Sequence, residues 1–276
     1  MKYIYLAITI FLFTACEDVI DLPLQEGPKR LVIDANINLD MNAVGSQEQA
    51  IRLTETTGFY ETFIPPANGA TVKITRKSNN DEFTFLESGT SGIYKTLSFL
   101  PIVGEVYELT VIYNDETFTA EEEMMAVANI DSTSQTTENF FGTEVIKVEH
   151  FFQDPESEEG QGNFYINQFN YPTFLIDSYG ARSDDFSDGQ LNSIFEQSED
   201  FEPGEVLTLY FYGASKQYFN YFNLLQDQIQ SGGPFGTPPA AVKGNCINTT
   251  NPDLKPLGYF RLSEMVKLRY TIEPIE

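Results

Sequence analysis

The chain has 276 residues, of which 16 are lysine or arginine and 41 are aspartate or glutamate, so its formal net charge is −25. An acidic field of this size repels polyphosphate, and we expect no nucleic-acid partner. The length suits one large or two modest domains, and an aromatic content of 14% argues against wholesale disorder.

The N-terminus has the pattern of an export signal. Met1-Lys2 precedes an apolar run from Tyr3 to Phe13 that is too short to span a bilayer comfortably, and the small residues Thr14-Ala15 follow it. Phe13-Thr14-Ala15-Cys16 resembles a bacterial lipobox, with phenylalanine where leucine is commoner. We therefore expect a signal peptide over residues 1–15 and a mature chain that begins at a diacylated Cys16. A plain signal peptide with an incidental cysteine, or a short membrane anchor, is the alternative.

A lipid on Cys16 would leave one cysteine, Cys246, and hence no intramolecular disulfide. Cys246 lies beside expected strand residues, which favours a buried, unreactive side chain. Because two or three acyl chains make a stable anchor, the protein would be tethered to a membrane through its N-terminus.

The first half of the mature chain has the periodicity of short strands. Residues 16–28 are acidic and contain proline, and we interpret them as a tether. From Leu31 to Leu39 apolar and polar residues alternate, as in a half-buried strand. Further strands are expected at 51–54, 70–75, 82–86, 92–97, 107–113 and 118–120, separated by turn-forming residues. About seven strands with no intervening helix predict an immunoglobulin-like antiparallel β-sandwich over residues 29–126.

A segment rich in Ser, Thr, Asn and Gln, residues 126–143, predicts the boundary of a second β-rich domain over residues 127–276. Its strands are expected at 145–152, 163–169, 173–176, 191–196 and 206–212, with one or two closing strands over 257–272. One amphipathic helix is expected near 215–231. Ser215 is a suitable N-cap, and Gly232-Gly233-Pro234 is a typical helix end.

The apolar stripe of this helix includes Tyr218 and Tyr221 at helical spacing. Packing on the sheet of the second domain is the simplest interpretation. A partner-facing or ligand-binding surface, with these tyrosines exposed, is the alternative.

The residues offer little for catalysis. His150 is the only histidine, so a nucleophile–histidine relay has a single candidate base, and a histidine-rich zinc site is excluded by count. Its place in a strand pattern favours a side chain on the solvent face. Carboxylate pairs of the glycosidase type are compatible with the composition, because an acidic chain contains many such pairs by chance. We expect a non-enzymatic protein without a cofactor.

One acidic cluster has a metal-binding interpretation. Asp184, Asp185 and Asp188 precede Gly189, and closely spaced Asp oxygens before a glycine turn can bind calcium. The spacing departs from the EF-hand pattern, so an Asp-rich turn that joins two strands is the preferred interpretation.

Several landmarks along the chain occur in an order that is similar to a known family. After the lipobox come Asn68-Gly69-Ala70-Thr71-Val72-Lys73-Ile74, Gly92-Ile93-Tyr94, Tyr107-Glu108-Leu109-Thr110-Val111, Asp154-Pro155, Gly162-Asn163-Phe164-Tyr165, Asn248-Thr249-Thr250-Asn251-Pro252 and Leu257-Gly258-Tyr259-Phe260. Together they resemble the Bacteroidota lipoproteins grouped as domain of unknown function four-two-four-nine, over nearly the full mature length.

This resemblance implies an outer-membrane lipoprotein encoded beside TonB-dependent receptors. Glu17-Asp18 after Cys16 also resembles the acidic tags that direct such lipoproteins to the cell surface. We therefore expect an accessory or binding subunit of an outer-membrane barrel complex, with a TonB-dependent receptor as the favoured partner. A surface protein that binds glycan or peptide is the second hypothesis, and a carboxylate-dependent hydrolase is the third.

Overall fold

The computed structural model describes residues 27–157, 162–171, 177–230 and 242–275. In these ranges the chain is mainly β-structure with one helix, as the sequence predicts. Cys16, most of the expected tether and the strand expected at 173–176 lie outside the described residues.

Seven strands come from the N-terminal half. They are β1 (Leu31–Asp40), β2 (Gln49–Glu55), β3 (Thr71–Arg76), β4 (Glu82–Glu87), β5 (Ile93–Thr96), β6 (Val106–Tyr113) and β7 (Glu116–Met125). In β1 the alternation seen in the sequence becomes alternating burial, because every second side chain points to the same face of a sheet.

The C-terminal half supplies the remaining elements. They are β8 (Ser132–Phe140), β9 (Thr143–Gln153), β10 (Phe164–Asn170), β11 (Ser178–Ser183), β12 (Leu191–Ser198), β13 (Val206–Ala214), α2 (Lys216–Gln230), β14 (Ile247–Asn248) and β15 (Leu257–Thr271). The Ser/Thr-rich segment at the expected boundary forms β8, an edge strand with mostly exposed side chains, which explains its lack of a hydrophobic period.

The main sheet does not have the arrangement of a simple sandwich. Its twelve strands follow the order β11-β10-β13-β15-β1-β2-β5-β4-β3-β6-β7-β14, and β15 also pairs with β7. Eight strands, from β15 through β1 to β7, therefore close into a barrel-like ring. The expected immunoglobulin-like sandwich is corrected in this respect, because the strand that closes the ring comes from the far end of the chain.

Strand β15 is the central element of the fold. Its first part pairs in parallel with β1, from Val32 opposite Leu257 to Asp40 opposite Met265. Its last part pairs antiparallel with β13, which continues the sheet into β10 and β11. Residues of the expected second domain thus complete the sheet of the first.

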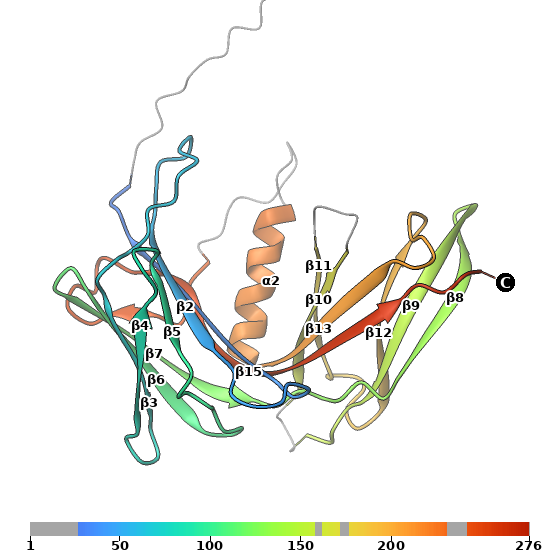
Figure 1. Cartoon of the computed structure of the whole chain (residues 1–276), viewed down its shortest axis with the longest axis horizontal. Helices are drawn as coiled ribbons and strands as arrows, with labels where there is room; N and C mark the ends of the chain where they lie inside the picture. The colour runs from blue at the N-terminus through green and yellow to red at the C-terminus, as the bar shows by residue number, and fades with distance from the viewer. Residues whose placement is uncertain (1–26, 158–161, 172–176, 231–241, 276) are drawn as a thin grey trace, which may run out of the picture.

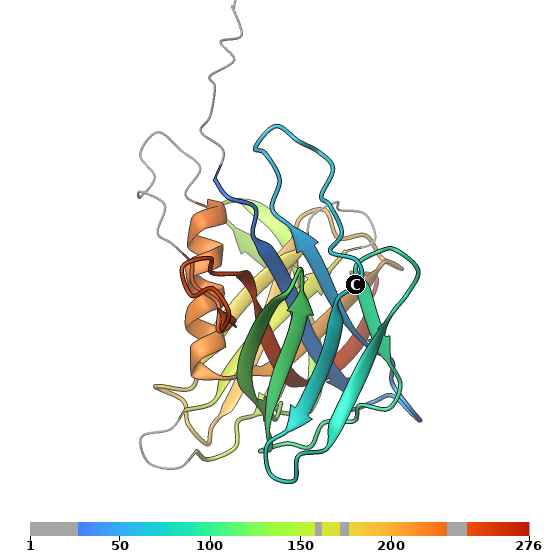
Figure 2. The same cartoon turned by 90° about the vertical axis from the view of Figure 1, so that its left-hand side faces the viewer.

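Three cores meet at β15. Phe260 and Leu262 belong to the core inside the ring, and Val266 belongs to a second core formed with β9, β10, β12 and β13. Tyr259 belongs to the third, beneath α2. A three-stranded sheet, β12-β9-β8, stands at the far end of the molecule. Figure 1 shows the main sheet curving around α2, and Figure 2 shows α2 along one side of the ring.

Candidate functional site

Three carboxylates converge where β9 and β11 end. Asp154 follows β9, and Asp184 and Asp188 lie in the turn between β11 and β12. One carboxylate oxygen from each lies within 4.8 Å of the others. Asp154 and Asp184 are buried, whereas Asp188 is exposed. The sequence therefore identifies two members of this cluster and misses Asp154, while Asp185 instead accepts a hydrogen bond from Ser183 Oγ at 2.7 Å.

Hydrogen bonds hold each carboxylate in place. Tyr165 donates its hydroxyl to Asp154 Oδ1 at 2.7 Å, and the backbone N–H of Asn163 donates to Asp184 Oδ2 at 2.8 Å. The N–H of Ser157 donates to Asp188 Oδ1 at 2.8 Å. Burial raises the pKa of Asp154 above its ordinary value, and the nearby charge of Asp184 raises it further, while hydrogen bonds from Tyr165 and Asn163 act in the opposite direction.

The oxygen-only donor set of this cluster matches a hard cation such as calcium better than zinc. The same residues also form the hydrogen bonds of an ordinary turn that needs no metal ion. Ser187 N–H donates to the carbonyl of Asp184 at 2.7 Å, and Gln190 N–H donates to the carbonyl of Ser187 at 3.0 Å. Calcium and a structural turn thus both remain compatible with the three carboxylates.

Helix α2 packs its aromatic stripe against the sheet, which confirms the simplest interpretation of its pattern. The N–H of Tyr218 donates to Ser215 Oγ at 3.1 Å, as expected of an N-cap. Tyr218 is only 9% exposed and its ring meets that of Tyr259 at 4.9 Å. The alternative interpretation, in which Tyr218 is exposed, is wrong. Tyr221 is half-buried, and burial raises its pKa to about 12.

Arg261 connects the helix to the sheet. Its guanidinium lies 4.6 Å from the ring centroid of Tyr212 and 5.0 Å from that of Tyr218. Its Nη2 donates to Asn38 Oδ1 at 2.5 Å, and its Nε donates to Asn36 Oδ1 at 3.3 Å. The arginine is 5% exposed, so these contacts take place away from bulk water. We interpret this cluster as a structural one.

The face on which α2 packs is left partly open beyond the helix. Tyr179, Gln168, Tyr210 and Lys267 stand opposite one another on β11, β10, β13 and β15, and therefore form a row on one face. Tyr179 is 48% exposed, and the Lys267 amine lies 5.2 Å from the Tyr210 ring centroid. The row offers aromatic, amide and ammonium groups together. No pattern along the sequence identified it, because its members come from four strands.

His150 is buried, and the expectation that it lies on a solvent face is wrong. Its side chain is 1% exposed, and its Nδ1 is 2.8 Å from the Thr133 hydroxyl. Its ring stacks on that of Phe169 at 6.0 Å. Burial lowers the pKa of His150 to about 4, so the imidazole is neutral at physiological pH.

Cys246 is buried in the core of the ring, which confirms the expectation of a buried side chain. Burial raises its pKa to about 12, and a thiolate is therefore not formed near neutral pH.

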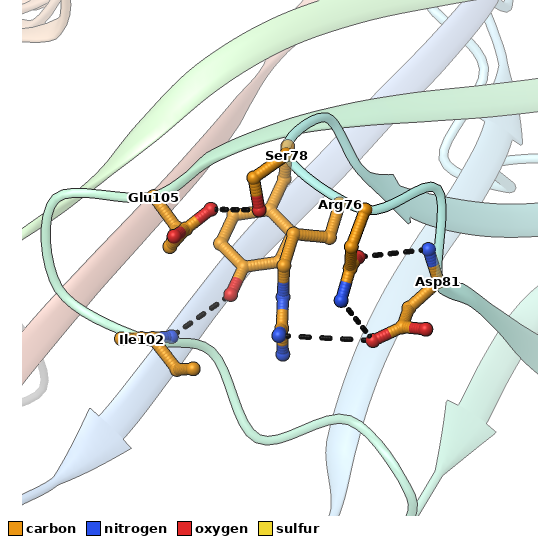
Figure 3. A network of polar contacts seen from close by, with 7 residues as sticks. Arg76, Ser78, Asp81, Ile102 and Glu105 are labelled. Carbon is orange, nitrogen blue, oxygen red and sulfur yellow. Dashed lines mark hydrogen bonds and ion pairs between the residues drawn. The ribbon is translucent and has the colours of Figure 1, made fainter.

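A third polar cluster ties the β3–β4 turn to the β5–β6 connection (Figure 3). Ser78 Oγ donates to Glu105 Oε2, and the N–H of Ile102 donates to the Tyr107 hydroxyl at 2.9 Å. Arg76 forms an ion pair with Asp81 at 3.7 Å, and its guanidinium lies 5.9 Å from the ring centroids of Phe83 and Tyr107. These contacts fix the two turns relative to each other.

The fold and these sites define a mainly β protein in which a barrel-like ring continues into an open, curved sheet. In the described part of the chain, no helix is both long enough and apolar enough to cross a membrane. The chain belongs to the family described as domain of unknown function (DUF4249), whose family model matches residues 17–269. No curated protein matches the chain.

Two solved structures are among the matches. A segment of two fibronectin type III domains from chicken tenascin has 14% identity and a TM-score of 0.21, with 63% of this chain and 89% of that chain covered. The FN1–FN3 domains of chicken CNTN1 have 11% identity and a TM-score of 0.22, with 84% of this chain and 65% of that chain covered, slightly less than two thirds of its length. Both TM-scores are low.

Proposed function

We propose that this protein is a non-enzymatic lipoprotein, anchored through Cys16 to the outer membrane, that acts as an accessory or binding subunit of an outer-membrane barrel complex. The favoured partner is a TonB-dependent receptor, and the favoured location is the cell surface. The lipobox-like segment and the resemblance of the chain to lipoproteins support the anchorage.

The observation that carries the binding role is an apolar connection on the surface of the ring. Between β5 and β6, Leu97, Leu100, Ile102 and Val103 are 62%, 58%, 50% and 43% exposed. Phe99, in the same connection, is 1% exposed and packs on Phe83 and Tyr107, so the backbone is held while its neighbours face outward. Exposed apolar side chains that gather in one place mark interaction surfaces.

The environments of His150 and Cys246 support a role without catalysis. The imidazole and the thiol are the groups best suited to proton transfer and nucleophilic attack, and both are packed in cores.

Purification from gently solubilised membranes tests the proposal. A tagged protein should be recovered together with a barrel protein, and Leu100→Ser with Ile102→Ser should weaken that recovery. Val44→Ser is the matched control, because Val44 is fully exposed in the β1–β2 loop. Recovery of the wild type as a monomer in every mild detergent would count against the proposal. Cys16→Ala should release the protein from the membrane while its sheets remain folded.

A surface ligand-binding protein is the second candidate, and the row of Tyr179, Gln168, Tyr210 and Lys267 supports it. Tyrosine faces beside amide and ammonium groups suit a glycan or a peptide. Titration of the Cys16→Ala protein with glycans or peptides would show binding without a membrane partner. Tyr179→Ala should then reduce the affinity, and Tyr60→Ala, at a tyrosine exposed elsewhere, should not.

A further inference from the structure

The connection between β2 and β3 carries an exposed apolar loop, residues 57–64. Phe59, Tyr60, Phe63 and Ile64 are 82%, 65%, 69% and 52% exposed. Glu61 is the only charged residue in the loop, although 21% of the whole chain is charged. Large apolar side chains this close together and this exposed are unusual on a protein that stays in water.

The base of this loop is firmly closed. The N–H of Glu55 donates to the carbonyl of Pro65 at 2.9 Å, and Thr54 forms a β-bridge with Pro66. Within the loop, Glu61 N–H donates to the carbonyl of Gly58 at 3.0 Å, and the Phe59 and Tyr60 rings meet edge to face at 5.1 Å. The aromatic side chains are thus presented on an ordered turn and do not fold back onto the core.

The loop lies beside the point where the chain enters the fold. Thr56 N–H donates to the carbonyl of Arg30 at 2.9 Å, and Arg30 N–H donates to Thr56 Oγ1 at 3.0 Å. Leu31, the first residue of β1, pairs with Glu55, the last residue of β2. Figures 1 and 2 both show the β2–β3 connection rising at the end of the molecule where β1 begins.

Chain length keeps this end close to the lipid anchor. Cys16 precedes Gly27 by eleven residues. Even fully extended, those residues span at most about 40 Å, which is comparable to the thickness of one bilayer. If the proposed anchorage at Cys16 holds, the end of the molecule where β1 begins stays within about 40 Å of the lipid, and Phe59 and Phe63 at that end can reach the membrane.

We propose that residues 57–64 form a membrane-contacting loop that inserts its aromatic side chains into the interfacial region of the lipid bilayer. Aromatic side chains concentrate at the membrane–water interface, where an apolar ring and a polar tip are both satisfied. Lys29 and Arg30 place two cationic side chains at the base of the loop, where Lys29 also forms an ion pair with Glu55 at 3.9 Å. Acyl chains and loop together would hold the body of the protein in one orientation over the membrane. This inference rests on the proposed anchorage and deepens it.

Tryptophan fluorescence tests the inference directly, because the chain contains no tryptophan. The full-length lipidated protein is purified with the single substitution Phe59→Trp and reconstituted into phosphatidylcholine vesicles, with and without bromine on the acyl chains. Val44→Trp is the matched control. Val44 is fully exposed in the β1–β2 loop, and the antiparallel pairing of β1 with β2 places that loop at the opposite end of the ring.

In vesicles, Phe59→Trp should emit at a shorter wavelength than in detergent-free buffer and should be quenched by the brominated lipid, whereas Val44→Trp should show neither effect. Flotation of the protein with the vesicles reports the anchorage separately. Flotation with Phe59→Trp emission equal to that of Val44→Trp would overturn the loop contact alone. Shielding of the Phe59→Trp fluorophore only after a barrel protein is added would overturn it in favour of a protein contact. Loss of flotation would overturn both proposals.

Discussion

The guanidinium of Arg261 on β15 lies 4.6 Å from the ring centroid of Tyr212 on β13, and it joins the two parts of the main sheet under α2. Asn36 and Asn38 on β1 accept hydrogen bonds from the same group. One side chain thus contacts the ring, the open sheet and the helix.

Replacement of this buried cation should destabilise the protein. Arg261→Leu removes two hydrogen bonds from a charged donor and a desolvated cation–π contact, and we expect a loss of about 2–4 kcal/mol in the free energy of unfolding. Urea denaturation measures the loss, with Arg269→Leu, at an exposed arginine of the same strand, as the control. Equal effects of the two substitutions would show that the cluster contributes nothing specific.

Gly258, a landmark in the sequence, has a physical role. Its φ is +94°, and a Cβ built on it would lie 2.0 Å from the carbonyl oxygen of Ile33 on the neighbouring β1. Gly258→Ala should therefore cost about 2–4 kcal/mol, through backbone strain and a clash with a strand that cannot move away. Gly104→Ala is the control, because Gly104 has a φ of +81° with open space around it. Its cost should be only about 1 kcal/mol. Thermal or urea unfolding measures the loss of stability in each variant. Because both glycines have a positive φ and only Gly258 has a close neighbour, the difference between the two losses is the cost of the clash.

The sequence predicts strands and the helix better than it predicts their partners. Alternating residues identify β1, and Ser215 correctly marks the start of α2, because both signals are local. The parallel pairing of β1 with β15 leaves no local signal, since it joins opposite ends of the chain. The closed ring was therefore beyond prediction from periodicity.

At the candidate sites, the burial of His150 can be read from the sequence, whereas the approach of Asp154 to Asp184 cannot. Along β9 the buried face includes Ile146, Val148 and Phe152, and His150 and Asp154 share their phase in the alternation. That phase predicts burial of both residues, although polar side chains are ordinarily expected on the exposed face. The approach of Asp154 to Asp184 depends on the relation between β9 and β11, strands in different sheets, and no spacing in the sequence indicates it.

Burial of His150 should make stability depend on pH. Its pKa falls from 6.5 to about 4 on folding, so below pH 6.5 the unfolded chain binds a proton that the folded chain excludes. The contribution of the neutral His150 to the free energy of unfolding is fully present above pH 6.5. It is lost as the pH falls towards 4, by about 3 kcal/mol. Between those pH values, wild-type protein should lose about 3 kcal/mol more of its free energy of unfolding than His150→Gln does. Urea unfolding at several pH values provides the measurement, and parallel curves would contradict the prediction.

The carboxylate cluster should be electrostatically strained in the absence of a cation. Asp188→Asn keeps an acceptor for the Ser157 N–H and removes one of three neighbouring negative charges. In chelator at neutral pH, we expect the substitution to raise the free energy of unfolding by roughly 0.5–1 kcal/mol, because the exposed Asp188 repels a neighbouring charge about 5 Å away and water screens this repulsion. Asp185→Asn, outside the cluster, is the control. Calcium titration of the wild type and of Asp184→Asn then distinguishes the two interpretations of the turn. A rise in the unfolding midpoint that Asp184→Asn abolishes would identify a calcium site, whereas equal midpoints with calcium and with chelator would leave an Asp-rich turn whose repulsion is offset by Tyr165, Asn163 and Ser157.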